Sequence, residues 1–133
     1  MDFLNSSNAN MAPHYLIMAF FAITFLQSGI DKVIDWKGNL GWLNGHFKSS
    51  ALAGQVKLML GILTIVEFIS GLACIWAMVA LLKDDKSAVS CALTICGVNL
   101  LMLLFGQRMA KDYAGAATIG QYMVMVLLGF ALL

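Results

Sequence analysis

The sequence predicts an all-α fold: an integral-membrane antiparallel four-helix bundle with a short interfacial helix in its first loop. Of the 133 residues, 61% are hydrophobic and only 11% are charged, a balance far from that of a soluble domain. The apolar residues fall into four blocks, each close to the roughly 20 residues that a membrane-spanning helix needs. The connections between the last three blocks are short, and short connections make neighbouring helices antiparallel.

The spans can be placed in order along the chain. Residues 1–12 are polar and are expected to form a flexible N-terminal segment, after which Pro13 suits the first turn of a helix. No Lys or Arg precedes the first span and no Ala-x-Ala-like site follows it, so we expect it to be retained rather than cleaved as a signal peptide. The predicted spans, within one domain of residues 13–133, cover residues 13–29, 58–82, 88–106 and 113–133.

The first loop, residues 31–57, is the only long one, and part of it has helical amphipathicity. Gly38, Gly41 and Gly45 weaken a helix, so an irregular loop is the alternative. We favour a short helix in the membrane interface, with Trp42 near the headgroups, because a loop would leave aromatic side chains in water. One face of this helix carries Trp36, Leu40, Leu43 and Phe47, and the opposite face carries Lys37, Asn44 and Lys48.

The distribution of Lys and Arg predicts the orientation in the membrane, because basic residues in short loops favour the cytoplasmic side. The first and third loops together hold six of these residues, and the second loop holds two. We therefore expect the first and third loops in the cytoplasm and both termini outside. The residues counted are Lys32, Lys37, Lys48, Lys57, Arg108 and Lys111, against Lys83 and Lys86 in the second loop.

Glu67 is the only Asp, Glu, Lys or Arg within the four predicted spans. A charged side chain near the bilayer centre is costly, which makes such a residue a candidate for function. Its neighbours one and two turns away, Thr64, Ser70, Gly71 and Cys74, form a small and weakly polar stripe. Stripes of this kind face other helices, so we expect Glu67 to point into the bundle.

Three further polar side chains lie at nearly the depth of Glu67. Thr24, Asn99 and Gln121 each lie eight or nine residues from the charged end of their span, and Glu67 lies ten from Lys57, which is roughly 12 to 15 Å. We expect the four side chains to form one polar core network. Two interpretations stay open: these groups satisfy a structural carboxylate and hold the helices together, or Glu67 titrates and relays a proton or binds a polar headgroup.

A second polar cluster lies at the cytoplasmic boundary, where the first span ends and the last two spans connect. Ion pairs such as Lys32 with Asp112 or Arg108 with Asp31 can form there, and exposed pairs contribute little stability. The alternative is ordinary interfacial anchoring by charged side chains. The cluster comprises Gln27, Ser28, Asp31, Lys32, Gln107, Arg108, Lys111 and Asp112.

Several chemistries can be argued against. His14 and His46 lie at opposite ends of the predicted bundle, which disfavours a bis-histidine haem, and the scarcity of ligands disfavours a metal site. Cys74, Cys91 and Cys96 form no Cys-x-x-Cys motif and are expected to be packing residues. No basic stripe interleaved with aromatic residues suggests nucleic acid.

Three segments of the sequence resemble the DoxX family of small bacterial four-helix membrane proteins, and the resemblance covers most of the chain from about Leu16. Gly29 and Lys32 resemble the Gly-x-x-Lys at the end of the family's first span, and Glu67 and Gly71 resemble the Glu-x-x-x-Gly of its second span. The segments are FLQSGIDKV (25–33), VEFISGL (66–72) and GQRMAKDYAGAA (106–117). The resemblance implies a DoxX-like four-helix domain in a bacterial cytoplasmic membrane.

The functions that the resemblance implies range from a subunit of a thiosulfate:quinone oxidoreductase to proteins of thiol homeostasis. Some members carry a His in or near the third span, where this chain has Asn99 and Gln107. Our leading hypothesis is an accessory subunit, not catalytic on its own, that packs in the bilayer against a larger respiratory or redox-linked complex or forms a homo-oligomer. No cofactor is predicted for this subunit. One alternative is a quinone-linked oxidoreductase subunit that binds quinone and uses Glu67 for proton transfer. Another is a lipid or small-solute binding protein or carrier with a cavity at the level of Glu67.

Overall fold

The structure, a computed structural model, describes residues 11–46, 54–109 and 112–133. These residues form five helices and contain no strand, which confirms the all-helical prediction. The helices are α2 (Ala12–Ile34), α3 (Trp36–His46), α4 (Val56–Leu81), α5 (Lys86–Met109) and α6 (Tyr113–Ala131). All except α3 are long and apolar enough to cross a membrane. Most of the predicted flexible segment, residues 1–10, and also Phe47, Lys48 and Lys111, lie outside the described residues.

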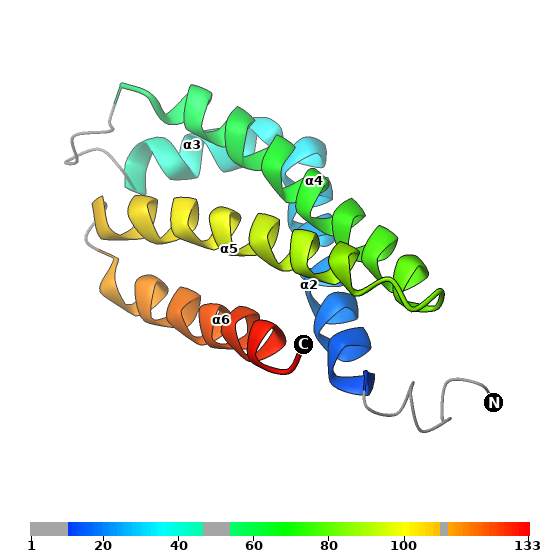
Figure 1. The fold of residues 1–133 in the computed structure, drawn as a ribbon. Coiled ribbons are helices and arrows are strands. Elements are labelled where there is room, and N and C mark those ends of the chain that lie inside the picture. The colour runs from blue at the N-terminus through cyan, green and yellow to red at the C-terminus, as the bar shows by residue number, and fades with distance from the viewer. Residues whose placement is uncertain (1–10, 47–53, 110–111) are drawn as a thin grey trace.

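The three C-terminal helices lie side by side in the order α4, α5, α6, and α2 crosses behind α4 and α5 (Figure 1). The most extensive contacts are those of α2 with α4, of α4 with α5 and of α5 with α6. By comparison, α2 and α6 meet over a small area. One long face of α6 is therefore left without a neighbour among the described residues.

The first long helix extends further than its hydropathy predicts, ending at Ile34 instead of Gly29. Asp31 and Lys32 stay helical, and a basic residue in the last turn is favourable there because it faces the negative end of the helix dipole. Only Asp35 separates α2 from α3, so the first loop is mostly helix at its start.

The amphipathic helix expected in the first loop is confirmed as α3, and its position at a membrane interface stays a prediction. Trp36, Leu40 and Leu43 are half-buried, while Lys37 and Asn44 on the opposite face are exposed. The apolar face predicted from the sequence is therefore the packed one. The glycines expected to weaken this helix do not end it.

Acidic side chains begin the last two helices. Asp85 accepts hydrogen bonds from the backbone N–H of Ser87 at 3.1 Å and from its hydroxyl, and Asp112 accepts one from the N–H of Gly115 at 3.0 Å. These bonds satisfy backbone donors that a helix start leaves unpaired. The hydrogen bonds from Ser87 hold the pKa of Asp85 below its usual range.

Glycines allow α2 and α4 to approach closely. A Cβ added at Gly71 would lie 2.5 Å from Leu26 Cγ, and one at Gly29 would lie 3.1 Å from the ring of Phe68. As the residue number rises along α2 its partner's number falls along α4, so the two helices run in opposite directions at this contact. Small residues at helix interfaces let backbones pack closely, and this contact sets the position of the site described below.

His14 joins the first turn of α2 to the end of α6. The imidazole is fully buried, and its Nε2 lies 2.9 Å from the carbonyl oxygen of Gly129. A carbonyl only accepts hydrogen bonds, so Nε2 carries the proton. The apolar core lies alongside, with Phe21 stacked on Phe25 at 5.6 Å between ring centroids.

Candidate functional site

Lys32 and Glu67 form an ion pair between α2 and α4. The Lys32 ammonium lies 3.0 Å from Oε2 and 3.1 Å from Oε1 of Glu67, so both carboxylate oxygens accept from it. It also donates to the hydroxyl of Ser28, one turn earlier on α2. Glu67 is 2% exposed and Lys32 is 16% exposed. The pair is thus almost closed off by protein.

The position of Glu67 follows from the face of α4 on which it lies. The stripe predicted to face another helix is confirmed, since all of its members are buried: Thr64, Glu67, Ser70, Gly71 and Cys74. Because Gly71 has no side chain, α2 can lie against this stripe at Leu26. That close approach brings Lys32, two turns further along α2, level with Glu67.

This ion pair was not predicted from the sequence, because Lys32 was expected to pair with Asp112 at the cytoplasmic boundary. Counting depth from a first span that ends at Gly29 puts Lys32 outside the hydrocarbon and Glu67 near its middle. In the structure α2 continues past Lys32, and its long side chain reaches back to Glu67. The two opposite charges in facing segments were the signal that could have found the pair.

Among the described residues, no hydrogen bond joins any two of the four side chains expected to form one network. Asn99 is fully buried and donates from Nδ2 to the hydroxyl of Ser70 at 3.2 Å, one turn from Glu67. Its Oδ1 is buried without a hydrogen-bond partner among the described residues. Thr24 is half-buried on α2, and Gln121 is exposed on α6. Glu67 is therefore satisfied by Lys32, and Gln121 lies outside any shared network with it.

The boundary cluster separates into different roles. Arg108 lies over the ring of Tyr113, 5.1 Å from its centroid, and its expected ion pair with Asp31 is not formed. Ser28 and Lys32 belong to the Glu67 site, and Asp112 caps α6. The remaining described members have these places: Gln27 and Asp31 are exposed, and Gln107 lines a cavity.

The two buried cysteines meet between α4 and α5. Their sulfur atoms, from Cys74 and Cys96, lie 3.4 Å apart, while Cys91 is exposed. The thiols fill a closely packed part of the core. This agrees with the packing role expected of Cys74 and Cys96, whereas Cys91, for which the same role was expected, is exposed.

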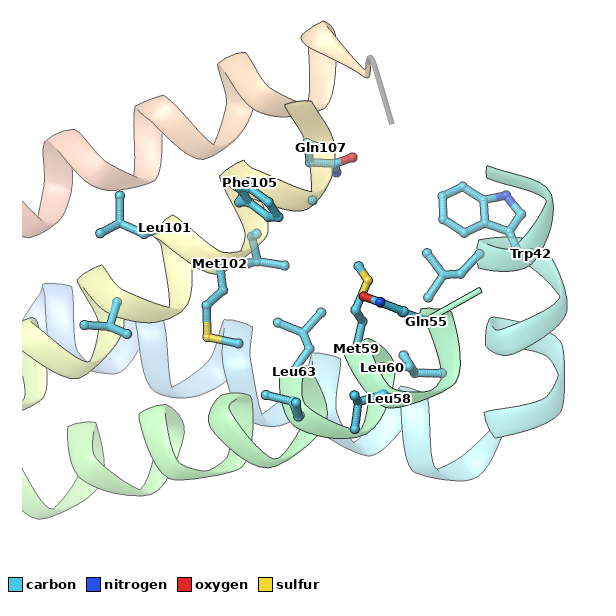
Figure 2. A pocket seen from close by; sticks show the side chains of 15 residues that line it. Trp42, Gln55, Leu58, Met59, Leu60, Leu63, Leu101, Met102, Phe105 and Gln107 are labelled. Carbon is cyan, nitrogen blue, oxygen red and sulfur yellow. The ribbon is translucent and has the colours of Figure 1, made fainter. Parts of the chain in front are cut away.

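A cavity of about 620 Å³ lies between α3, α4 and α5 (Figure 2). Its walls are mostly aliphatic, with Trp42, Gln55 and Gln107 toward the end that α3 forms and Leu101 and Met102 toward the other. Glu67 does not line it. This cavity was not predicted, because it depends on how α3 folds back against the ends of α4 and α5.

The arrangement around Glu67 is suited to holding helices together. Lys32 donates to both carboxylate oxygens and neutralises the charge of Glu67. The loss of one partner of such a buried pair destabilises the folded protein. The site presents no cluster of metal ligands among the described residues. The chain matches no protein-family model, no curated protein and no solved structure in the comparisons made with each.

Proposed function

We propose that this chain is an accessory subunit of a larger complex in a bacterial cytoplasmic membrane, built as an antiparallel four-helix bundle of the DoxX type. The four apolar helices fit a small multi-pass membrane protein. Two of the segments that resemble the family contact each other, through Lys32 with Glu67 and Leu26 with Gly71. That contact supports the assignment, because it gives the resembling residues a shared physical role.

The observation that carries the proposal is the position of Gln121. It lies about halfway along the 19-residue α6, on a face that no described part of the chain covers. Among the described residues its amide has no hydrogen-bond partner. In hydrocarbon an unpaired amide costs about 2–7 kcal/mol, so this side chain calls for a partner outside the bundle.

The surroundings of Gln121 suit a helix as that partner. Ala114, Ala117 and Thr118 lie one and two turns before it, and all three are exposed. Thr118 donates to the carbonyl oxygen of Ala114 at 3.2 Å and needs nothing further. Small residues allow close backbone approach, and an amide then bonds across the interface, a contact worth about 1 kcal/mol. The partner is therefore a transmembrane helix of another subunit.

The two alternative functions have less support from the geometry. Proton transfer by Glu67 to a quinone needs access to the carboxylate, and its two oxygens are both engaged by Lys32. A carrier with its cavity at the level of Glu67 needs that residue in the cavity wall, where it is not found. We therefore assign Glu67 the structural role and do not propose catalysis.

The orientation proposed for the subunit places α3 on the cytoplasmic side. The start of α4, the end of α5 and the start of α6 lie at the same end of the molecule as α3 (Figure 1). Lys32, Lys57 and Arg108 lie near this end, whereas Lys83 and Lys86 lie at the other. The excess of basic residues supports a cytoplasmic location for the α3 end.

Cysteine cross-linking in native membranes tests the interface. In a Cys91→Ser background, which removes the exposed native thiol, Ala117→Cys labelled with a thiol-reactive photo-cross-linker should give cross-linked products on illumination. Leu72→Cys is the matched control, because Leu72 is 59% exposed on α4, remote from the α6 face. Products of equal yield from both positions, or from neither, would contradict an α6 interface. A product containing only two copies of this chain would replace the accessory role with a homo-oligomer.

A further inference from the structure

The cavity between α3, α4 and α5 has the shape of a slot with one polar end. Trp42 and Leu43 of α3 form one wall, and the facing sides of α4 and α5 form the rest (Figure 2). Along α5 the lining runs from Val98 to Gln107, nine residues or roughly 14 Å at the helical rise. Its volume of about 620 Å³ is in the usual range for small-molecule sites.

The length and the polar end suit one leaflet of a bilayer. Half of the roughly 30 Å hydrocarbon core is about 15 Å, close to the length of the slot. Gln55 and Gln107 lie at the ends of α4 and α5, where the chain leaves the apolar segments, and the other end of the slot lies deeper between those helices. A ligand with a long apolar chain and a polar group at one end matches both features.

The chemistry of the lining selects the polar group. None of the described lining side chains is charged. The amides of Gln55 and Gln107 offer N–H donors to carbonyl or ester oxygens, and they offer no charge to balance a phosphate. We propose that the slot binds one acyl chain of a membrane lipid from the α3-side leaflet, with the two amides holding the glycerol ester region.

This site is separate from the interface proposed for α6, because no residue of α6 lines the slot. A subunit without a partner could hold the lipid, and a subunit without the lipid could keep the partner. The slot also differs from ordinary lipid contact along a helix. It has walls from three helices and one polar end, so it should hold one lipid at a saturable site.

Native mass spectrometry of the purified full-length chain in mild detergent tests the proposal. The probe is palmitoyl-oleoyl phosphatidylethanolamine, which has no net charge, and the comparison is phosphatidylglycerol with the same chains. We expect one lipid per chain with saturable binding, and affinities for the two lipids within about threefold, since the lining reads the chain and esters. Unsaturable binding of many lipids, or binding of the anionic lipid alone, would overturn the proposal.

Matched variants locate the binding. Val98→Trp fills the slot from an exposed position and should weaken lipid binding at least about tenfold. Leu72→Trp places the same ring at an exposed position of α4 outside the slot and should leave binding unchanged. The double variant Gln55→Leu/Gln107→Leu should keep the helical circular dichroism and lose most of the affinity. Equal binding by Val98→Trp and Leu72→Trp would exclude the slot as the site.

Discussion

The Lys32 ammonium lies 3.0 Å from Oε2 of Glu67 and so joins the end of α2 to the middle of α4. The pair occupies the one place among the described residues where a cation and a buried carboxylate meet. Glycines on both helices make the contact close enough to form. The ion pair and the close packing at the glycines therefore stabilise the same contact between α2 and α4.

Loss of one partner should destabilise the chain more than loss of both. Glu67→Gln and Lys32→Met should each lower the free energy of unfolding by about 3–5 kcal/mol, because each leaves a buried charge or polar group unpaired. The double variant should recover part of that loss. Unfolding of the purified protein in mixed micelles, followed by circular dichroism, measures all three. Additive losses in the double variant would show that the two side chains do not interact.

The glycine contact gives a second prediction. Gly71→Ala should cost about 1–3 kcal/mol, because the added Cβ would lie 2.5 Å from Leu26 Cγ and the helices would have to separate. Gly120→Ala is the control, since a Cβ there meets no atom within 4 Å. The same unfolding measurement serves. Equal effects at the two glycines would mean that α2 and α4 are not closely packed at Gly71.

The cap of α5 gives a pH prediction. Hydrogen bonds from Ser87 lower the pKa of Asp85 in the folded chain. Their stabilisation is therefore fully present above the ordinary Asp pKa of about 3.9 and is lost as the pH falls through the lowered value. Asp85→Ala should lower the thermal midpoint of unfolding at pH 7. On acidification, the midpoint of this variant should fall less than that of the wild type. Asp84→Asn, in the same turn, should leave that pH dependence intact. An equal change in both variants would show that the Asp85 cap does not cause it.

The excess of basic residues at the α3 end predicts the topology. Green fluorescent protein fused after Leu133 should not fluoresce if the C-terminus is exported unfolded, and alkaline phosphatase fused there should be active. Fusions within the first loop should show the opposite pattern. Fluorescence after Leu133 would reverse the orientation and place the proposed lipid slot in the other leaflet.

Features that depend on a single helix were predicted correctly from the sequence. The apolar blocks predicted the four long helices, and the spacing around Glu67 predicted its buried stripe, because helical periodicity is local. The amphipathic pattern after Trp36 predicted α3 in the same way.

Features that depend on how two helices pack against each other were not predicted from the sequence. The helix α2 continues to Ile34 because its surroundings favour the charged residues Asp31 and Lys32. Hydropathy alone assigns these two residues to a loop. Gln121 has the depth expected of a network member, but depth does not give the direction in which a side chain points. Pairing Lys32 with Glu67 required the alignment of α2 with α4, which no single-helix pattern contains.

The proposed function depends on the exposed α6 face around Gln121 binding another membrane subunit. Purification of the tagged chain from its native membrane in mild detergent, followed by mass spectrometry, tests this binding. We expect another membrane protein in stoichiometric amount with the wild type and its loss with Gln121→Leu, while Thr94→Leu, at an exposed polar position on α5, should retain it. A chain that purifies alone, or a partner that Gln121→Leu keeps in full, would contradict the proposal.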